Sequence, residues 1–354
     1  MGALVAGPLG RSSRPASESD GVRIRIVAAA VAASLVGWMA AAAVAGPATP
    51  RYPVPWTFAA GVAAGATEGP DVAPPGSNVA CRPTAAHPYP VVLVHGLGAD
   101  QNDNWQTISP FLADAGFCVF SLTYGNRPSE PSPFNKSGGL TDMVQSARQL
   151  GAFVQRVLAR TGAAKVDIVG HSEGGTMPDW YIKFGGGYRY VDQFVVLAGA
   201  LHGTNFWGMT DLYRDGEPYG MSQAMAAQMS PYCTACFEFF PFSTFISAVD
   251  SPHARGGAPS CSKDGAAVSG VRYTSIATNN DELVRPPTSG FIAPGCPGTR
   301  DILLQDQCPT DQADHVSVAA DPVAATDILN ALSGGRPRPV PCGVVAPGLG
   351  APLG

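Results

Sequence analysis

The sequence predicts an α/β fold with a mostly parallel sheet and helices on both of its faces. Short runs of β-branched and apolar residues alternate along the chain with longer segments that carry apolar residues at helical spacing. This alternation is typical of a parallel sheet that is covered on both sides. The chain has 354 residues, of which 45% are hydrophobic, so it is long and apolar enough to bury a sizeable core.

The individual elements follow from these local patterns. We expect strands at residues 89–95, 118–123, 166–169, 191–197, 271–277 and 301–305, and helices at residues 105–115, 142–160 and 321–332. Residues 205–250 break the alternation because they are rich in Met and Phe. We interpret this segment as a small cap insertion over an apolar pocket, since ligands bind at the carboxyl ends of the strands in such folds. The alternative is a core-packing excursion of two short helices.

The first 45 residues have the pattern of an export signal. Arg23 and Arg25 precede an apolar run at residues 26–44, and small residues lead up to a cleavage site after Ala45. This order is typical of a signal peptide, here residues 1–45, which would make the mature protein secreted. The alternative is an uncleaved membrane anchor formed by residues 26–44, facing outside, because the run can span a thin bilayer.

The remaining chain divides into three parts by composition. Residues 46–80 are rich in Pro, Ala and Gly and predict a flexible lead-in, and residues 334–354 form a Gly/Pro-rich tail. The domain itself is expected at residues 81–333. The formal net charge is −5, so the protein has no electrostatic reason to bind nucleic acid.

Cysteine usage also indicates an exported protein. The chain has eight cysteines, all beyond the export segment, and an even number in such a chain suggests disulfides. Cys233 and Cys236 have a spacing found in zinc and redox sites. No second Cys or His pair at metal-ligand spacing accompanies them, so a structural disulfide is the better interpretation and no metal site is expected.

The most informative stretch is the strand at residues 166–169 and the turn that follows it. The turn, residues 170–174, matches the pattern G-x-S-x-G, which is typical of the nucleophile elbow of α/β-hydrolases. Such a turn is so tight that glycines must flank the serine. It would expose Ser172 Oγ at the mouth of the sheet and place the Glu173 N–H at a helix N-terminus, where it can face an oxyanion.

A serine hydroxyl becomes a useful nucleophile when a histidine accepts its proton, and that histidine needs a carboxylate to orient it. In α/β-hydrolases the chain order is serine, acid, histidine. His315 lies after the last predicted strand and before the final helix, so we expect it to be the base. His202 comes too early, and we expect it to pack or form hydrogen bonds near the site. His253 lies in a polar loop with no strand before it.

The acid should lie just past the strand that precedes His315. Asp281 is four residues beyond the end of that strand and is our candidate. Glu282 is adjacent and competes with it, whereas Asp250 lies before the strand and fits less well.

The loop after the first strong strand is placed to supply the second oxyanion donor, and we choose the Leu97 N–H. We expect His95 to hold the shape of this loop. In the cap, the dense Phe run predicts a substrate-binding surface at Phe239 and Phe240.

Five sequence blocks, in order, resemble the secreted bacterial lipases of the class 2 type. They are VVLVHG at 91–96, QNDNW at 101–105, GHSEGGTMP at 170–178, NDELV with a following Pro at 280–286, and DH at 314–315. The resemblance covers roughly residues 81–332. It implies an α/β-hydrolase fold, carboxylic ester hydrolysis without a cofactor, and the roles already given to Ser172, Asp281 and His315. It also implies Cys81–Cys118 and Cys296–Cys308 disulfides.

We therefore expect a secreted serine ester hydrolase that acts on lipid or other apolar esters and makes transient contact with a lipid interface. An acyltransferase would use the same three residues with an alcohol in place of water. A non-catalytic lipid-binding protein is a second alternative, and the complete order of serine, acid and histidine argues against it.

Overall fold

The computed structural model describes residues 51–131, 135–252 and 255–351. The expected signal peptide, and the alternative membrane anchor at residues 26–44, lie outside these ranges. Within them, no helix has both the length and the apolar character needed to cross a membrane.

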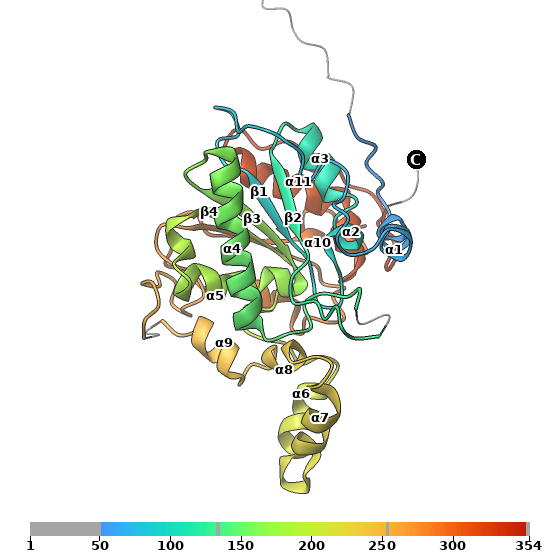
Figure 1. Ribbon diagram of the computed structural model, residues 1–354, viewed down its shortest axis with the longest axis vertical. Coiled ribbons are helices and arrows are strands. Elements are labelled where there is room, and N and C mark those ends of the chain that lie inside the picture. Colours follow the sequence, from blue (N-terminus) through green and yellow to red (C-terminus); the bar gives the residue numbers. More distant parts are fainter. Residues whose placement is uncertain (1–50, 132–134, 253–254, 352–354) are drawn as a thin grey trace, which may run out of the picture. The chain divides into compact units, whose positions relative to one another are not determined.

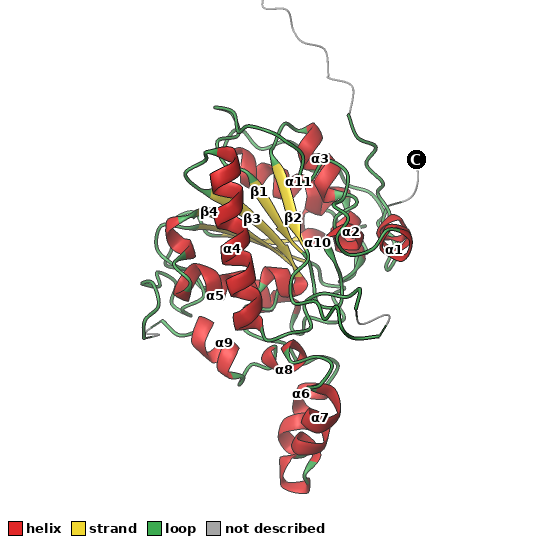
Figure 2. Cartoon of the chain, viewed as in Figure 1, coloured by secondary structure: helices red, strands yellow, loops and turns green. Residues whose placement is uncertain are grey.

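A six-stranded parallel sheet forms the centre of the molecule (Figure 2). Its strand order is β2-β1-β3-β4-β5-β6, and every neighbouring pair is parallel. The sheet confirms the α/β fold class, and the strands are β1 (Val91–Val94), β2 (Val119–Leu122), β3 (Val166–His171), β4 (Val191–Leu197), β5 (Arg272–Ala277) and β6 (Arg300–Leu303). β1 to β3 are buried along their whole length, which explains their continuous apolar character.

Helices cover both faces of the sheet, and each face has its own apolar core. α4 (Met143–Thr161) and α5 (Met177–Phe184) pack on one face, where residues such as Leu150 join Phe194 of β4 in one cluster. α3 (Ile108–Asp114) and α11 (Pro322–Ser333) contribute to a second cluster with the residues that β1, β3 and β4 present to the other face. The remaining short helices of the main body are α1 (Phe58–Thr67), α2 (Gln101–Asn104), η1 (Ser172–Gly175), η2 (Gly187–Arg189), η4 (Pro287–Gly290), α10 (Leu304–Gln307) and η5 (Ser317–Ala320).

The segment between β4 and β5 forms the insertion expected at residues 205–250. It contains more helices than the two short ones of the alternative: α6 (Met209–Asp215), η3 (Glu217–Tyr219), α7 (Met221–Met229), α8 (Ala235–Glu238) and α9 (Thr244–Val249). Figure 1 shows α6 and α7 projecting away from the sheet and its covering helices.

An ion pair joins the two ends of this insertion. His202 Nδ1 lies 2.6 Å from Asp250 Oδ1, and His202 Nε2 lies 2.8 Å from the Phe291 carbonyl oxygen. Both ring nitrogens therefore face acceptors, and only the doubly protonated imidazolium can donate to both. Burial lowers the pKa of His202, but the hydrogen bond and charge of Asp250, with Asp264 adding to them, raise it overall to about 9. The partly buried, hydrogen-bonding role expected for His202 is thus what the structure shows.

A buried lysine also binds the chain at the C-terminal end of the insertion. The Lys183 ammonium of α5 donates to the carbonyl oxygens of Val249, Ser251 and Gly265 at 2.6, 2.7 and 2.9 Å. Three carbonyl acceptors match the three N–H bonds of the group, so its burial leaves none of them unpaired. The end of the insertion is therefore attached to the helix that follows Ser172.

The described parts of the lead-in and the Gly/Pro-rich tail form specific contacts with each other and with the domain. Residues 58–67 form α1, which packs on α2, and Thr57 forms an antiparallel bridge with Gly350 of the tail. Residues 51–80 and 334–351 are held in place by short contacts with distant parts of the chain. They have no amphipathic face, so their sequence shows no periodicity that would predict these contacts.

The eight cysteines form four disulfides. Cys81 is bonded to Cys118, as the resemblance implied, and Cys233 is bonded to Cys236 as a structural pair. The implied Cys296–Cys308 bond is wrong. Cys296 is bonded to Cys261, and Cys308 is bonded to Cys342 of the Gly/Pro-rich tail.

The His202 ion pair predicts a specific pH dependence of stability. A pKa raised from 6.5 to about 9 by folding gives a contribution that is complete below about pH 6.5 and is lost as the pH rises through about 9. The melting temperatures of the wild type and His202→Gln should therefore differ most near pH 6 and least near pH 9.5. Thermal denaturation at three pH values measures this gap. A gap that is constant or widens with pH would show that His202 is not held as the cation.

Candidate active site

Ser172 occupies the sharp turn between β3 and η1. Its φ of 55° lies in the left-handed region, which costs a non-glycine residue on the order of 1 kcal/mol or more. A Cβ on Gly170 would lie 1.6 Å from the Gly174 carbonyl oxygen, and a Cβ on Gly174 would lie 1.9 Å from the Val94 carbonyl oxygen. Only glycine fits at either position, so the turn has the geometry that the G-x-S-x-G motif predicts.

The structure brings Ser172, His315 and Asp281 together. His315 Nε2 lies 2.8 Å from Ser172 Oγ, and His315 Nδ1 lies 2.8 Å from Asp281 Oδ2. The other carboxylate oxygen of Asp281 accepts hydrogen bonds from the backbone N–H groups of Leu283 and Val284 at 2.9 and 2.7 Å. These bonds orient the carboxylate toward the imidazole. His315 and Asp281 are only 3% and 1% exposed, so water competes little for these contacts.

The competing acids lie elsewhere. Glu282 Oε2 accepts a hydrogen bond from the backbone N–H of His315 at 3.2 Å, so this side chain supports the loop and does not face the ring nitrogen. Asp250 is paired with His202 at the base of the insertion. Of the three acids considered, only Asp281 contacts the His315 imidazole.

Two residues without a sequence-based assignment connect the parts of the site. His171 Nε2 donates to the His315 carbonyl oxygen at 2.8 Å, and Nδ1 lies 3.1 Å from Asn104 Oδ1. Asn104 Oδ1 also accepts from the Gly96 N–H at 2.9 Å. Burial and the charge of His315 lower the pKa of His171 to about 3, so this ring is neutral and carries its one proton on Nε2. The 3.1 Å approach of Nδ1 to Asn104 Oδ1 is then a contact between two acceptors and not a hydrogen bond. Both residues lie inside sequence blocks that carry the class 2 resemblance. That resemblance is the one feature of the sequence that could have pointed to them.

The loop that carries Leu97 lies against Ser172. Gly96 approaches so closely that an added Cβ would be 3.0 Å from Ser172 Cβ. Below the loop, His95 Nδ1 donates to the Gly96 carbonyl oxygen at 2.8 Å, and Nε2 accepts from the Tyr124 N–H at 3.2 Å. This pattern requires a neutral ring, and burial lowers the pKa of His95 to about 4. His95 therefore shapes the loop, as expected.

Glu173, the other proposed oxyanion donor, has its N–H at the start of η1 and its side chain buried. Its carboxyl group points toward the loop at Gly139, where an added Cβ would lie 2.7 Å from Oε2. Burial and the nearby Glu238 raise the pKa of the Glu173 carboxyl well above its usual range. Burial thus favours the protonated carboxyl group, the form that adds no negative charge close to the place where the oxyanion would form.

An apolar cavity of about 140 Å³ opens at Ser172 and His315. The insertion contributes Phe206 and Phe239, whose ring centroids are 5.7 Å apart, and α1 contributes Phe58. The structure thus places Phe239 at the cavity as expected, while Phe206 and Phe58 were missed. The other lining residues are Gly96, Leu97, Ala99, Asn104, His171, Thr204, Leu283, Val284 and Val316.

Phe240 does not reach this cavity. It faces a second hollow of about 670 Å³ on the insertion, together with Tyr213, Phe237 and Phe242. Phe239 and Phe240 are consecutive residues just after α8, so their side chains diverge. Phe240 therefore does not share the wall that Phe239 forms at the Ser172 cavity, and its role in substrate binding stays a prediction.

Comparison with known proteins gives two relatives that match parts of this chain. Triacylglycerol lipases from Burkholderia plantarii and Pseudarthrobacter phenanthrenivorans are 36% and 38% identical over 127 and 96 residues. These matches cover 34% and 26% of this chain, and 32% and 27% of the relatives, so the chain spans about a third or less of their length.

Among solved structures, Aspergillus fumigatus lipase B is similar with a TM-score of 0.49 and 18% identity, over 77% of this chain and 62% of that one. The mature form of Bacillus licheniformis lipase BlEst2 is similar with a TM-score of 0.44 and 16% identity, over 69% of this chain and 91% of that one.

A family model, described as lipase (class 2), matches residues 88–321. This range contains Ser172, Asp281 and His315 and is well over half of the 354 residues. The protein therefore belongs to the class 2 lipase family.

Proposed function

We propose that this protein hydrolyses the carboxylic ester bonds of lipids or of other apolar esters. The reaction would pass through an acyl-enzyme on Ser172. The observation that carries the proposal is the continuous contact from Ser172 Oγ through the His315 ring to Asp281, with both hydrogen bonds at 2.8 Å. A base in contact with the nucleophile, itself oriented by a buried carboxylate, is the arrangement that activates a serine. The class 2 lipase family supports the same chemistry.

The reaction follows from this arrangement. Ser172 Oγ attacks the ester carbonyl carbon while His315 Nε2 accepts the hydroxyl proton, and the carbonyl oxygen becomes an oxyanion. The Leu97 and Glu173 N–H groups stabilise this oxyanion. His315 then donates the proton to the departing alkoxide, so the alcohol leaves and an acyl-serine ester stays. A water molecule deprotonated by His315 attacks this ester, and the acid and free Ser172 are released. Asp281 accepts the hydrogen bond from His315 Nδ1 and so keeps the imidazole oriented through both steps.

The cavity supports an apolar substrate. Most of its lining beyond Ser172 and His315 is hydrocarbon or aromatic, and Phe206 and Phe239 form one wall. Such a surface gains free energy when it covers an acyl or alkyl chain, and it offers no cation for a charged ester.

We also propose that the enzyme works outside the cell, after removal of residues 1–45 as a signal peptide. Four disulfides support this location, because structural disulfides persist in oxidising compartments and are rare in the cytosol.

Replacing the nucleophile should abolish turnover and leave the fold intact. Ser172→Ala removes only a hydroxyl from the turn, so the melting temperature should stay within a few degrees of the wild type. Loss of the nucleophile should lower kcat by roughly 10⁶-fold, as in other serine hydrolases. The assay is hydrolysis of an ester series from acetyl to oleoyl, with labelling by a fluorophosphonate probe as a second readout. Wild-type turnover or labelling in this variant would remove Ser172 from the mechanism.

The two neighbouring acids give a matched pair of variants. Asp281→Asn should lower kcat on the order of 10³–10⁴-fold, because an amide favours the wrong tautomer of the His315 ring. Glu282→Gln keeps an acceptor for the His315 backbone N–H and should leave kcat within a few-fold of the wild type. Steady-state kinetics on a soluble short-chain ester measures both. The reverse ranking would assign the acid to Glu282.

A further inference from the structure

Phe58 reaches the proposed active site from a segment far from it in the sequence. It is the first residue of α1, and it lines the same cavity as Ser172, His315 and Phe206. It lies 30 residues before the family match begins at residue 88, so nothing in that match includes it.

α1 is seated between two parts of the active site. On one side it packs on α2 (Figure 1), where an added Cβ on Gly61 would lie 2.0 Å from the Asp103 carbonyl oxygen. On the other side it contacts η5, which begins two residues after His315. α2 also contains Asn104, the residue that binds the Gly96 N–H of the oxyanion loop. The position of Phe58 is therefore set by the elements that hold the oxyanion loop and the base.

The C-terminal tail fixes the start of α1. The Phe58 N–H and the Thr57 hydroxyl both donate to the Leu349 carbonyl oxygen at 2.9 Å. Gly350 has a φ of 105°, and an added Cβ would lie 2.7 Å from the Trp56 carbonyl oxygen, so only glycine permits this close contact.

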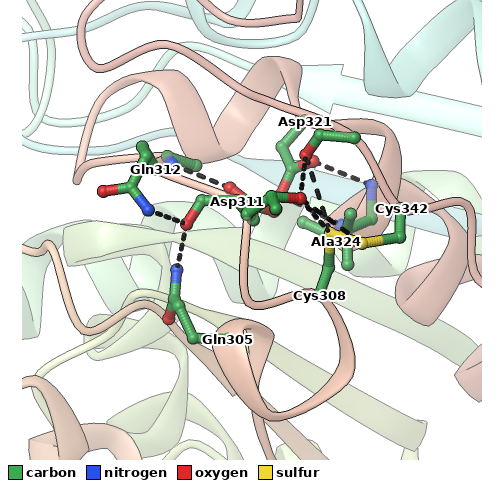
Figure 3. The surroundings of a disulfide bond; sticks show 11 residues. Gln305, Cys308, Asp311, Gln312, Asp321, Ala324 and Cys342 are labelled. Carbon is green, nitrogen blue, oxygen red and sulfur yellow. Dashed lines mark hydrogen bonds between the residues drawn. A yellow bond between two sulfur atoms is a disulfide. The ribbon is translucent and has the colours of Figure 1, made fainter.

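The tail is itself attached to the loop that precedes His315. Cys342 is bonded to Cys308, and the Gln312 N–H donates to the Val345 carbonyl oxygen at 3.1 Å. Figure 3 shows this disulfide beside Asp311, which lies in the loop before His315, and beside Asp321, which immediately precedes α11. Asp321 accepts from the Val323 N–H at 2.8 Å and so caps that helix. The tail, the loop that precedes His315 and the start of α11 are thus in contact around the Cys308–Cys342 disulfide.

We propose that Phe58 is a specificity-determining residue, and that the pairing of residues 56–58 with residues 349–350 holds its ring as a wall of the substrate cavity. This inference rests on the proposed ester hydrolysis at Ser172. A cavity of about 140 Å³ is small for a long chain, so a ring at its edge limits the size of the group that can lie beside Ser172. Phe206 and Phe239 bound the cavity from the insertion, and Phe58 does so from α1.

The first test changes the size of the side chain at this position. Phe58→Ala should raise kcat/KM for octanoyl relative to acetyl esters, or for octyl relative to methyl esters, by about 10-fold, and Phe58→Trp should lower the same ratio. Val62→Ala is the matched control, since Val62 lies on the same helix with 57% of its surface exposed. The ratio for this control should equal that of the wild type.

The second test shifts the position of the Phe58 ring without changing Phe58 itself. Gly350→Ala forces a side chain against the Trp56 carbonyl oxygen and should shift the chain-length ratio in the same direction as Phe58→Ala. Gly343→Ala is its control, because an added Cβ there meets no atom within 4 Å. A structural role alone would lower the melting temperature and reduce turnover of all esters by the same factor, without changing the ratio.

The outcomes separate this inference from the proposed function. If Phe58→Ala and Phe58→Trp leave the ratio within twofold of the wild type in both the acyl and the alcohol series, Phe58 is not a wall of the substrate site. Ester hydrolysis that still depends on Ser172 would then leave the proposed function standing. If Ser172→Ala retains wild-type turnover, the proposed function fails whatever the Phe58 variants do.

Discussion

The site depends on how closely the turn after β3 approaches the end of β1. Val94 and Gly170 are paired in the sheet register, and Gly174 crosses directly over the Val94 carbonyl oxygen. Because the backbones touch there, Ser172 and the loop that begins at Gly96 are held against each other at the carboxyl end of the sheet. The sheet is buried on both faces, so this register cannot slip without exposing its core. The position of Ser172 relative to the Gly96 loop is thus fixed by the register of the whole sheet.

From this contact, a set of neutral buried groups extends to the other parts of the site. His95 supports the loop at Gly96, while His171 links Asn104 on one side to the His315 backbone on the other. Burial depresses the pKa of both rings, so neither competes with His315 for a proton near neutral pH. The cationic side chains of Lys183 and His202 lie farther out, at the base of the insertion, where oxygen acceptors surround them. His95 and His171 are thus neutral supports that add no positive charge beside the His315 imidazole.

Much of this architecture could be predicted from local sequence. The strand expected at residues 191–197 is β4, and the chain order of serine, acid and histidine selects three residues that the structure places in contact. The parts that could not be predicted depend on contacts between distant segments. α1 has few polar residues and no strong apolar face, and it is seated through Asp103 and Leu349. Likewise, spacing alone cannot select one partner for Cys308, because many pairings of eight cysteines are possible.

The meeting of the two ends of the domain has a consequence for how the protein is made. A chain that is synthesised from its N-terminus presents residues 57–58 long before residues 349–350 emerge. The Cys308–Cys342 bond likewise cannot form until residue 342 has been synthesised. The sheet, the turn at Ser172 and the base loop can therefore form while one side of the cavity is still open. On this geometry the cavity is closed last, when the tail arrives, so a nascent chain would pass through a form with a wider opening than that of the finished protein.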